Sequence, residues 1–258
     1  MILKVDIPEY QIQGKTLLSQ VRFSLSPNEL IVIVGRNGAG KSTLLKHIST
    51  EISNPKSYIE IFGKNISEYK IKTLAQQRAV LPQSTTLNFA YEVLEVVLLG
   101  RIPHQQRQTE STLDIEIAER CLADVGLKGY ERRNYLTLSG GEQQRVHFAR
   151  VLAQLSHVKH SKLLLLDEPT SSLDISHQHH SLKLVKNLTQ HNLSCIAILH
   201  DLNLTSQYAD KVLILDQGKI LAFGPPTTVL TSEILTKAFN YPIQTMSHPH
   251  SDRPLILT

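Results

Sequence analysis

A glycine-rich segment early in the chain leaves few folds open to it. Residues 35–42 read Gly-Arg-Asn-Gly-Ala-Gly-Lys-Ser, which matches the pattern Gly-x-x-x-x-Gly-Lys-[Ser/Thr] in full. An apolar run precedes the segment and a helical pattern follows it, as the pattern requires. The glycines let backbone N–H groups approach phosphate oxygens, and the helix directs its positive end at the same anion. The segment therefore predicts a triphosphate site, in which Lys41 reaches the β- and γ-phosphates and the Ser42 hydroxyl ligates Mg²⁺.

Short apolar runs separated by helical patterns indicate an α/β fold. The runs end abruptly in polar residues, which is typical of strands that are buried on both faces of a parallel sheet. The alternation of such strands with helices predicts a doubly wound core. The predicted strands lie at 31–34, 163–166 and 195–199, and the predicted helices at 42–49, 141–155 and 176–191.

Other stretches predict additions to this core. Apolar and polar residues alternate at 3–7 and 21–25, which predicts antiparallel strands at one edge. Residues 213–221 predict a hairpin that turns near Gln217 and Gly218.

Two further segments complete the expected organisation. The stretch 87–155 is mostly helical in pattern, with a break at Ile102-Pro103, and predicts a helical insertion. The residues after Pro242 contain proline and histidine, and we expect a loose tail there.

The composition limits the classes of protein that the chain can belong to. Of its 258 residues 41% are hydrophobic, which suffices for a packed core. The formal net charge of +4 is too mild to indicate nucleic acid as the main partner. Cys121 and Cys195 form no metal-type pair, so we expect a reducing compartment. The sequence shows no membrane-spanning run and no signal-peptide layout, so we expect a cytosolic chain whose membrane role comes through a partner.

Two acidic residues follow the leucine run 163–166. Ligands of an open parallel sheet sit beyond the carboxyl ends of its strands. We therefore expect Asp167 to lie near Ser42 and share its Mg²⁺, and Glu168 to orient or deprotonate an attacking water. His200 ends another predicted strand at the same edge, where a histidine can sense the γ-phosphate.

A second anion site is predicted at the start of the helix that covers 141–155. The run Leu138–Arg145 reads Leu-Ser-Gly-Gly-Glu-Gln-Gln-Arg. Ser139 can cap the helix, and Gly140 and Gly141 leave bare backbone donors at its positive end. Because the glycine-rich loop already holds the triphosphate from one side, we expect this second site to face the γ-phosphate of another subunit.

Together, the segments Gly35–Ser42, Leu163–Glu168 and Leu138–Arg145 resemble the motifs of ABC transporter nucleotide-binding subunits, and the likeness covers nearly the whole chain. The resemblance implies an α/β P-loop NTPase fold and ATP hydrolysis with Mg²⁺, not nucleotide binding alone. Arg36 stands where this family often has proline, and Asn28-Glu29 stands where Gly-Glu is usual. Neither departure removes a phosphate donor.

The same resemblance implies roles for single residues. Glu168, His200 and Gln83 take part in catalysis, and Gln83 touches Mg²⁺ or water and senses the channel. Mg²⁺ is held by Ser42, Gln83 and Asp167. Tyr10, expected just before the first strand pair, stacks on adenine, and Asp174 lies in a loop that crosses the dimer interface. The residues implied to bind ATP are Tyr10, Gly35, Arg36, Asn37, Gly38, Ala39, Gly40, Lys41, Ser42, Thr43, Ser139, Gly140, Gly141 and Asp174.

Within the family, the chain looks like an importer subunit. No membrane span is fused to it, and the stretch between Gln83 and Ser139 is too short for the long coiled coil of chromosome or DNA-repair proteins. The segment Gly100–His104 is similar to that of ATPases that serve iron-siderophore, cobalamin and haem importers. The helix at 141–155 and the polar insertion 156–161 are most similar to those of haem (hemin) importers.

The resemblance implies one ABC ATPase domain over 1–258. We expect a RecA-like core with its β subdomain at 1–84 and 156–241, a helical subdomain at 85–155 and a C-terminal tail at 242–258. We expect a homodimer that binds a permease dimer as a peripheral subunit on the cytoplasmic face of the inner membrane. The full complex also implies a periplasmic or surface substrate-binding protein, and we expect no nucleic acid partner.

Several alternatives remain at this point. The cargo is haem, a ferric siderophore or cobalamin, and a non-transport ABC ATPase or another class of P-loop enzyme, a kinase or GTPase, is a less favoured reading. The histidines at 177, 179 and 180 and at 248 and 250 can bind haem or metal, but a solvated helix face and a polar tail explain them more simply.

Overall fold

Six strands form the central sheet of the protein, whose computed structural model describes residues 1–85, 87–105 and 109–258. The strand order is β10-β9-β3-β8-β7-β6, and β10 alone runs antiparallel to its neighbour. Every residue of β3 and β8 is buried, which explains their continuous apolar runs. The strands are β3 (Leu30–Val34), β6 (Arg78–Leu81), β7 (Lys162–Asp167), β8 (Leu193–Ile198), β9 (Lys211–Asp216) and β10 (Lys219–Gly224).

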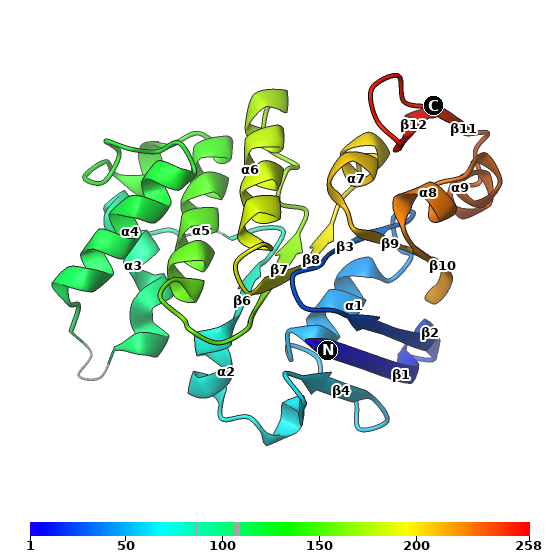
Figure 1. Ribbon diagram of the computed structural model, residues 1–258. Helices are drawn as coiled ribbons and strands as arrows, with labels where there is room; N and C mark the ends of the chain where they lie inside the picture. Colours follow the sequence, from blue (N-terminus) through cyan, green and yellow to red (C-terminus); the bar gives the residue numbers. More distant parts are fainter. Residues whose placement is uncertain (86, 106–108) are drawn as a thin grey trace.

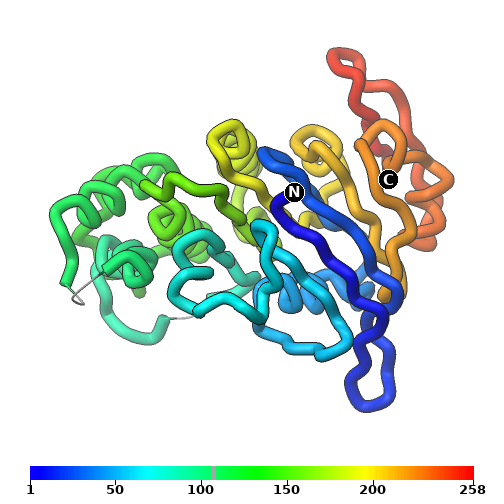
Figure 2. Tube along the Cα trace, turned by 60° about the horizontal axis from the view of Figure 1, so that its bottom comes forward, coloured from blue at the N-terminus to red at the C-terminus, as the bar shows by residue number. Residues whose placement is uncertain are grey.

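The N-terminal residues form a second, antiparallel sheet in the order β2-β1-β4-β5. Leu3 pairs with Leu25 and Ile7 with Val21, so the alternating pattern predicted this hairpin correctly. In Figure 2 the tip of the hairpin (blue) extends at the bottom of the view, and the C-terminal segment (red) extends at the top. The strands are β1 (Leu3–Ile12), β2 (Lys15–Leu25), β4 (Tyr58–Ile61) and β5 (Lys64–Asn65).

Helices cover both faces of the central sheet (Figure 1). The helix α1 (Lys41–Ile48) packs between the two sheets, where Ile31 and Ile33 of β3 join its apolar side chains. Leu30 and Val32 point to the other face, toward a larger apolar core. The helices of the core are α2 (Ile71–Gln77), α6 (Ile175–Leu188), α7 (Leu202–Tyr208), α8 (Pro226–Val229) and α9 (Ser232–Phe239), with a 3₁₀ turn, η1 (Ile66–Glu68).

A group of helices lies beside the sheet, where the sequence predicted a helical insertion (Figure 1). The predicted break at Ile102-Pro103 is a tight 3₁₀ turn, since the proline lacks the N–H that an α-helix needs. The elements are α3 (Val93–Leu98), η2 (Leu99–His104), α4 (Thr112–Asp124), η3 (Tyr135–Thr137) and α5 (Gly140–Leu155).

A buried ion pair joins these helices. Arg101 of η2 donates from Nε to Asp114 of α4 at 2.8 Å and from Nη1 to the Ala153 carbonyl of α5 at 2.7 Å. Burial alone would raise the pKa of Asp114, but hydrogen bonds from Arg101 and Ser111 leave it below its usual value. Both side chains are less than 10% exposed. The pair therefore fixes how η2, α4 and α5 meet.

Replacing Arg101 with methionine is expected to destabilise the chain by about 3–5 kcal/mol, because the substitution leaves the Asp114 carboxylate buried without its cation. Urea unfolding of the purified chain measures this loss. The exposed pair Arg22–Asp6 offers a matched control, and Arg22→Met should cost less than about 1 kcal/mol. Equal losses in the two variants would contradict a special role for the buried pair.

The expectation of a loose C-terminal tail is wrong. Gln244–Ser247 (β11) and Pro254–Leu257 (β12) pair as an antiparallel hairpin that packs on α7. Asn203 of α7 accepts from the Ile256 N–H at 2.8 Å and donates to the Ile256 carbonyl at 3.0 Å. The Ile256 side chain is buried, and Arg253 donates to the Ser206 and Ala209 carbonyls, so contacts with α7 order this segment.

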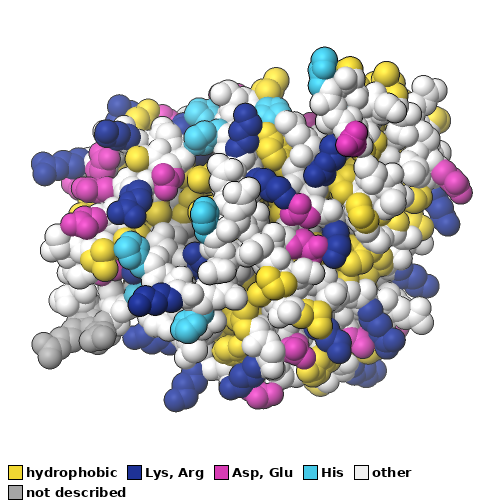
Figure 3. Space-filling model, in the orientation of Figure 1, with side chains coloured by type: hydrophobic (Ala, Val, Ile, Leu, Met, Phe, Trp, Pro, Cys, Tyr) yellow, Lys and Arg dark blue, Asp and Glu magenta, His cyan; other side chains and the backbone are white. Residues whose placement is uncertain are grey.

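The surface carries charges of both signs. On the face shown in Figure 3, Lys and Arg side chains are interspersed with Asp and Glu, so positive charge is not gathered into one patch there. None of the helices in the described ranges combines the length and the apolar character that a bilayer crossing requires.

Candidate functional site

The glycine-rich loop connects the end of β3 to α1. Gly35 has a φ of 150°, and a Cβ there would lie 2.1 Å from the Leu215 carbonyl oxygen. Gly40 has a φ of 103°, and its Cβ would lie 2.8 Å from the Leu17 carbonyl oxygen. Only glycine fits both positions, so the loop closes tightly and leaves its backbone N–H groups for an anion.

Lys41 occupies the first turn of α1 inside this loop. It is 6% exposed, and its Nζ donates to the Gly35 carbonyl at 2.7 Å and to the Arg36 carbonyl at 3.1 Å. Burial lowers the pKa of Lys41, while the charges of Glu168 and Asp167 oppose this shift. The ammonium is thus held at the anion site by neutral carbonyls, which a phosphate can replace as its partners.

Ser42 and Asp167 meet at the same edge of the sheet. The Ser42 hydroxyl donates to Asp167 Oδ1 at 3.4 Å, and Asp167 is 6% exposed at the end of β7. Burial raises the pKa of Asp167, the Ser42 hydrogen bond lowers it, and the Glu168 charge adds to the rise. The two oxygen atoms suit a hard divalent cation such as Mg²⁺, which prefers oxygen ligands.

Three predicted catalytic side chains converge beside this pair. Glu168 Oε2 accepts a hydrogen bond from Gln83 Nε2 at 2.9 Å, and Oε1 is in close contact with His200 Nε2. The Glu168 side chain is 12% exposed. Its carboxylate therefore sits in a partly water-excluded position, held from two sides by residues that come from distant parts of the sequence.

The backbone of Glu168 is strained. Its φ of 52° lies in the left-handed region, which costs a residue other than glycine on the order of 1–3 kcal/mol. The Glu168 carbonyl accepts from Gln144 Nε2 and Ser171 Oγ, both at 3.1 Å, and its N–H donates to the Ile198 carbonyl at 3.2 Å. These bonds fix the turn that aims the carboxylate, which is typical of a functional position.

The start of α5 is built as a capped helix end. Ser139 Oγ accepts from the Glu142 N–H at 3.3 Å, and Glu142 Oε2 accepts from the Ser139 N–H at 2.8 Å, so the two residues form a capping box. Ser139 and Gly140 are exposed, and a Cβ at Gly140 would meet nothing within 4 Å. Bare backbone donors at the positive end of α5 thus face solvent.

Two further predicted residues lie at the edges of the site. Tyr10 does not precede the first strand pair but lies within β1, opposite Leu18 of β2. It belongs there because the hairpin continues to Ile12, beyond the alternating pattern at 3–7. Asp174 caps α6, where its Oδ1 accepts from the His177 N–H at 2.9 Å.

Sequence reasoning missed two residues of the site. Gln144 of α5 donates to the Glu168 carbonyl at 3.1 Å and accepts from the Ser172 N–H at 3.3 Å, so it ties the predicted second anion site to the turn at Glu168. His47 of α1 contacts the Tyr10 ring. Gln144 stands inside the Leu138–Arg145 motif, which was a usable signal, whereas nothing in the sequence points from His47 to Tyr10.

The histidine groups have ordinary structural partners. His179 Nδ1 lies 2.8 Å from the Tyr208 hydroxyl, and His180 Nε2 lies 2.7 Å from the Asp124 carbonyl. His248 and His250 stack edge to face at the turn of the C-terminal hairpin. In the part of the chain that the structure describes, no three His, Cys, Asp or Glu side chains gather as a metal site.

Comparison with known proteins gives a consistent result. The family model described as "ABC transporter" matches residues 18–171. The chain is 51% identical to the hemin import ATP-binding protein HmuV of Deinococcus radiodurans, over 99% of this chain and 97% of that protein. It is 43% identical to the protein of the same name from Gloeobacter violaceus, over 96% and 90% of the two chains.

Solved structures share the fold. The chain superposes with a TM-score of 0.82 on a chain of an inward-facing, metal-chelate type ABC transporter, at 29% identity, with 99% of this chain and 95% of that one covered. It also superposes with a TM-score of 0.76 on the ATP-binding cassette MJ0796, a dimer bound to ADP and Pi, at 23% identity over 87% of this chain and 98% of that one.

Proposed function

Because the chain belongs to the ABC transporter family of ATP-binding subunits, we propose that it is the ATPase of a haem (hemin) importer and drives uptake through a separate membrane permease. The observation that carries the proposal is the Glu168 carboxylate, held by Gln83 and His200 beside the loop of Lys41 and Ser42. This is the arrangement that hydrolysis of a bound triphosphate needs. The cargo follows from the full-length similarity to hemin import proteins.

ATP binding begins at the glycine-rich loop. The backbone N–H groups of Gly35–Thr43 surround the phosphates, and the Lys41 ammonium exchanges the Gly35 and Arg36 carbonyls for phosphate oxygens. Ser42, Asp167 and Gln83 supply the oxygen ligands for Mg²⁺. A cation held there would neutralise phosphate charge. Tyr10 offers its ring to the adenine.

Hydrolysis then depends on Glu168. Its carboxylate accepts a proton from the attacking water, while the Gln83 amide holds the second carboxylate oxygen. His200 is 48% exposed, and its Nε2 can pass from Glu168 to the γ-phosphate when nucleotide is present. Catalysis is mainly the positioning of water and the stabilisation of phosphate charge.

The site is completed by a second copy of the chain. Ser139 and Gly140 face solvent and Gly141 is half-buried at the positive end of α5, which a γ-phosphate held by the partner subunit would neutralise. Asp174 caps α6 at the end of the loop that follows Glu168, and we place this loop at the interface between the two subunits. Two ATP molecules thus join two subunits, and loss of the γ-phosphate releases them.

An exposed apolar surface suits the permease. Ile71 of α2 is 89% exposed, and Leu99 and Ile102 of η2 are 38% and 55% exposed. The two elements lie side by side, since Gln76 of α2 donates to the Pro103 carbonyl at 3.0 Å. Because β6 leads from α2 to Gln83, a permease docked here would be linked to the nucleotide site. Docking on the permease would also hold the chain at the cytoplasmic face of the inner membrane. A substrate-binding protein delivers the cargo on the other side.

Transport by the reconstituted complex tests this function. Liposomes that hold the chain and its permease, supplied with a binding protein, should take up haem only with ATP and Mg²⁺. Ferric siderophore and cobalamin, tried in turn, should give no uptake above that seen without ATP. Uptake of either compound in place of haem would overturn the assignment of haem as the cargo. In a pull-down experiment, binding of the purified chain to DNA but to no membrane protein would overturn the transport function.

A further inference from the structure

Tyr10 lies close to the phosphate loop although it belongs to another sheet. It pairs with Leu18 across the hairpin, and Leu18 Cδ2 approaches within 3.0 Å of a Cβ built at Gly40. His47 lies six residues after Lys41 on α1, which corresponds to a rise of about 9 Å along the helix. The contact between the two rings therefore lies beyond the phosphate loop, and its relation to the base rests on the role proposed for Tyr10 above.

The two rings meet edge to face. Their centroids are 4.4 Å apart, and their planes make an angle of 81°. Such a contact favours one ring orientation over the others. His47 is 2% exposed, whereas Tyr10 is only partly buried, so part of the Tyr10 side chain is accessible to a ligand.

A hydrogen bond holds the His47 ring in place. Nδ1 lies 2.8 Å from the Thr43 carbonyl oxygen, one helical turn earlier, and must donate to it. Burial lowers the pKa of His47, which the Thr43 bond opposes only in part, so the ring is neutral with its proton on Nδ1. Nε2 is buried and has no hydrogen-bond partner among the described residues. The imidazole is therefore fixed through Nδ1 alone.

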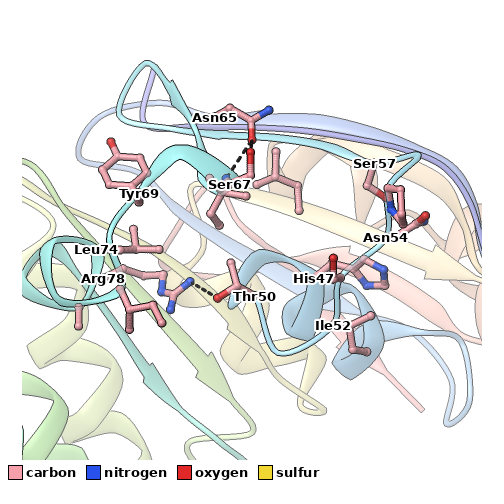
Figure 4. Close-up of a pocket in the computed structure, with 16 residues that line it drawn as sticks. His47, Thr50, Ile52, Asn54, Ser57, Asn65, Ser67, Tyr69, Leu74 and Arg78 are labelled. Carbon is pink, nitrogen blue, oxygen red and sulfur yellow. Dashed lines mark hydrogen bonds between the residues drawn. The ribbon is translucent and has the colours of Figure 1, made fainter.

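One side of His47 borders a cavity. A cavity of 560 Å³ lies along the end of α1, between β4 and α2, and His47 forms part of its wall (Figure 4). Its one guanidinium, that of Arg78, donates from Nη1 to the Ile48 carbonyl at 3.3 Å and to Thr50 Oγ1 at 3.4 Å. Because Arg78 thus faces the negative end of α1, we read the cavity as free space beside His47 and not as an anion site.

We propose that His47 is a positioning residue, which fixes the plane of the Tyr10 ring so that it is ready to stack on the adenine of ATP. The proposal rests on the function proposed above for Tyr10. Thr43, in the loop that holds the phosphates, orients His47, and His47 orients Tyr10. The phosphate end and the base end of the nucleotide site are in this way linked through one side chain.

The chain contains no tryptophan, which allows a direct test. In a Tyr10→Trp variant, the single indole should lose fluorescence when ATP stacks on it. Adding His47→Ala should remove most of this quenching and, in the chain with Tyr10, raise the KM for ATP about tenfold while kcat stays within about twofold. His47→Phe keeps a ring at this position and should restore most of the affinity, which a general loss of structure would not allow.

Ser57→Ala serves as the control, because Ser57 lines the same cavity and its Oγ is buried without a partner in the described chain. It should leave both quenching and KM unchanged. Unchanged quenching and KM in His47→Ala would overturn the role of His47. If Tyr10→Trp itself showed no quenching while calorimetry still detected ATP binding, the assignment of Tyr10 to adenine would fail instead.

Discussion

The Glu168→Gln variant is expected to hydrolyse ATP about 10²–10⁴ times more slowly than the wild type, while ATP binding persists. The amide keeps the size of the side chain and can still bond to Gln83, but it cannot accept a proton from water. Steady-state phosphate release measures the loss, and calorimetry measures binding.

Glu233→Gln is the matched control, since Glu233 lies in the first turn of α9, far along the chain from the site. It should hydrolyse ATP at the wild-type rate. Wild-type turnover in Glu168→Gln would mean that another group accepts the proton, and the assignment of the base would be wrong.

Lys41→Ala is expected to fail earlier, at nucleotide binding. Loss of a buried, hydrogen-bonded charge contact costs about 2–5 kcal/mol, and at about 1.4 kcal/mol per tenfold this weakens ATP binding by about 30- to 4,000-fold. Titration calorimetry with ATP and Mg²⁺ measures the change. Burial also lowers the pKa of Lys41, because the ammonium is cut off from water in the loop. Phosphate oxygens would supply the contacts that water cannot.

Lys46→Ala provides the comparison on the same helix, because Lys46 is exposed and makes no ion pair with a carboxylate in the described ranges. It should bind ATP as the wild type does. Equal weakening in both variants would show a general effect of positive charge and would remove the special role of Lys41.

Local patterns predicted the parts of the fold that depend on neighbouring residues. The continuous apolar runs correspond to β3, β7 and β8, whose residues are buried on both faces. The alternation near the N-terminus corresponds to β1 and β2, which expose one face. Both patterns are direct records of burial, so they can be read without knowing the tertiary structure.

The prediction of a loose C-terminal tail failed because the order of this segment depends on distant residues. Gln244–Ser247 holds no apolar alternation, and its hairpin is ordered by contacts with Asn203 and by burial of Ile256. These contacts join residues about fifty positions apart, and no local pattern encodes them. Tertiary packing therefore decided the structure of this segment.

The site divides in the same way. The glycine-rich loop follows from residue types at fixed spacing, and topology alone brings the ends of β3 and β7 to one edge. The contacts of Glu168 with Gln83 and His200 and that of Tyr10 with His47 depend on side-chain directions. Strand topology predicted Glu168 and His200, and the resemblance named Gln83 and Tyr10, but His47 required the structure.

The most direct test of the account is the molar mass of Glu168→Gln in solution with ATP and Mg²⁺, measured by light scattering during gel filtration. The account predicts a dimer with ATP and a monomer with ADP, because in the proposed dimer the γ-phosphate would join Lys41 of one subunit to the exposed Ser139 and Gly140 of the other. A monomer at every protein concentration with ATP, even in the presence of the permease, would contradict it.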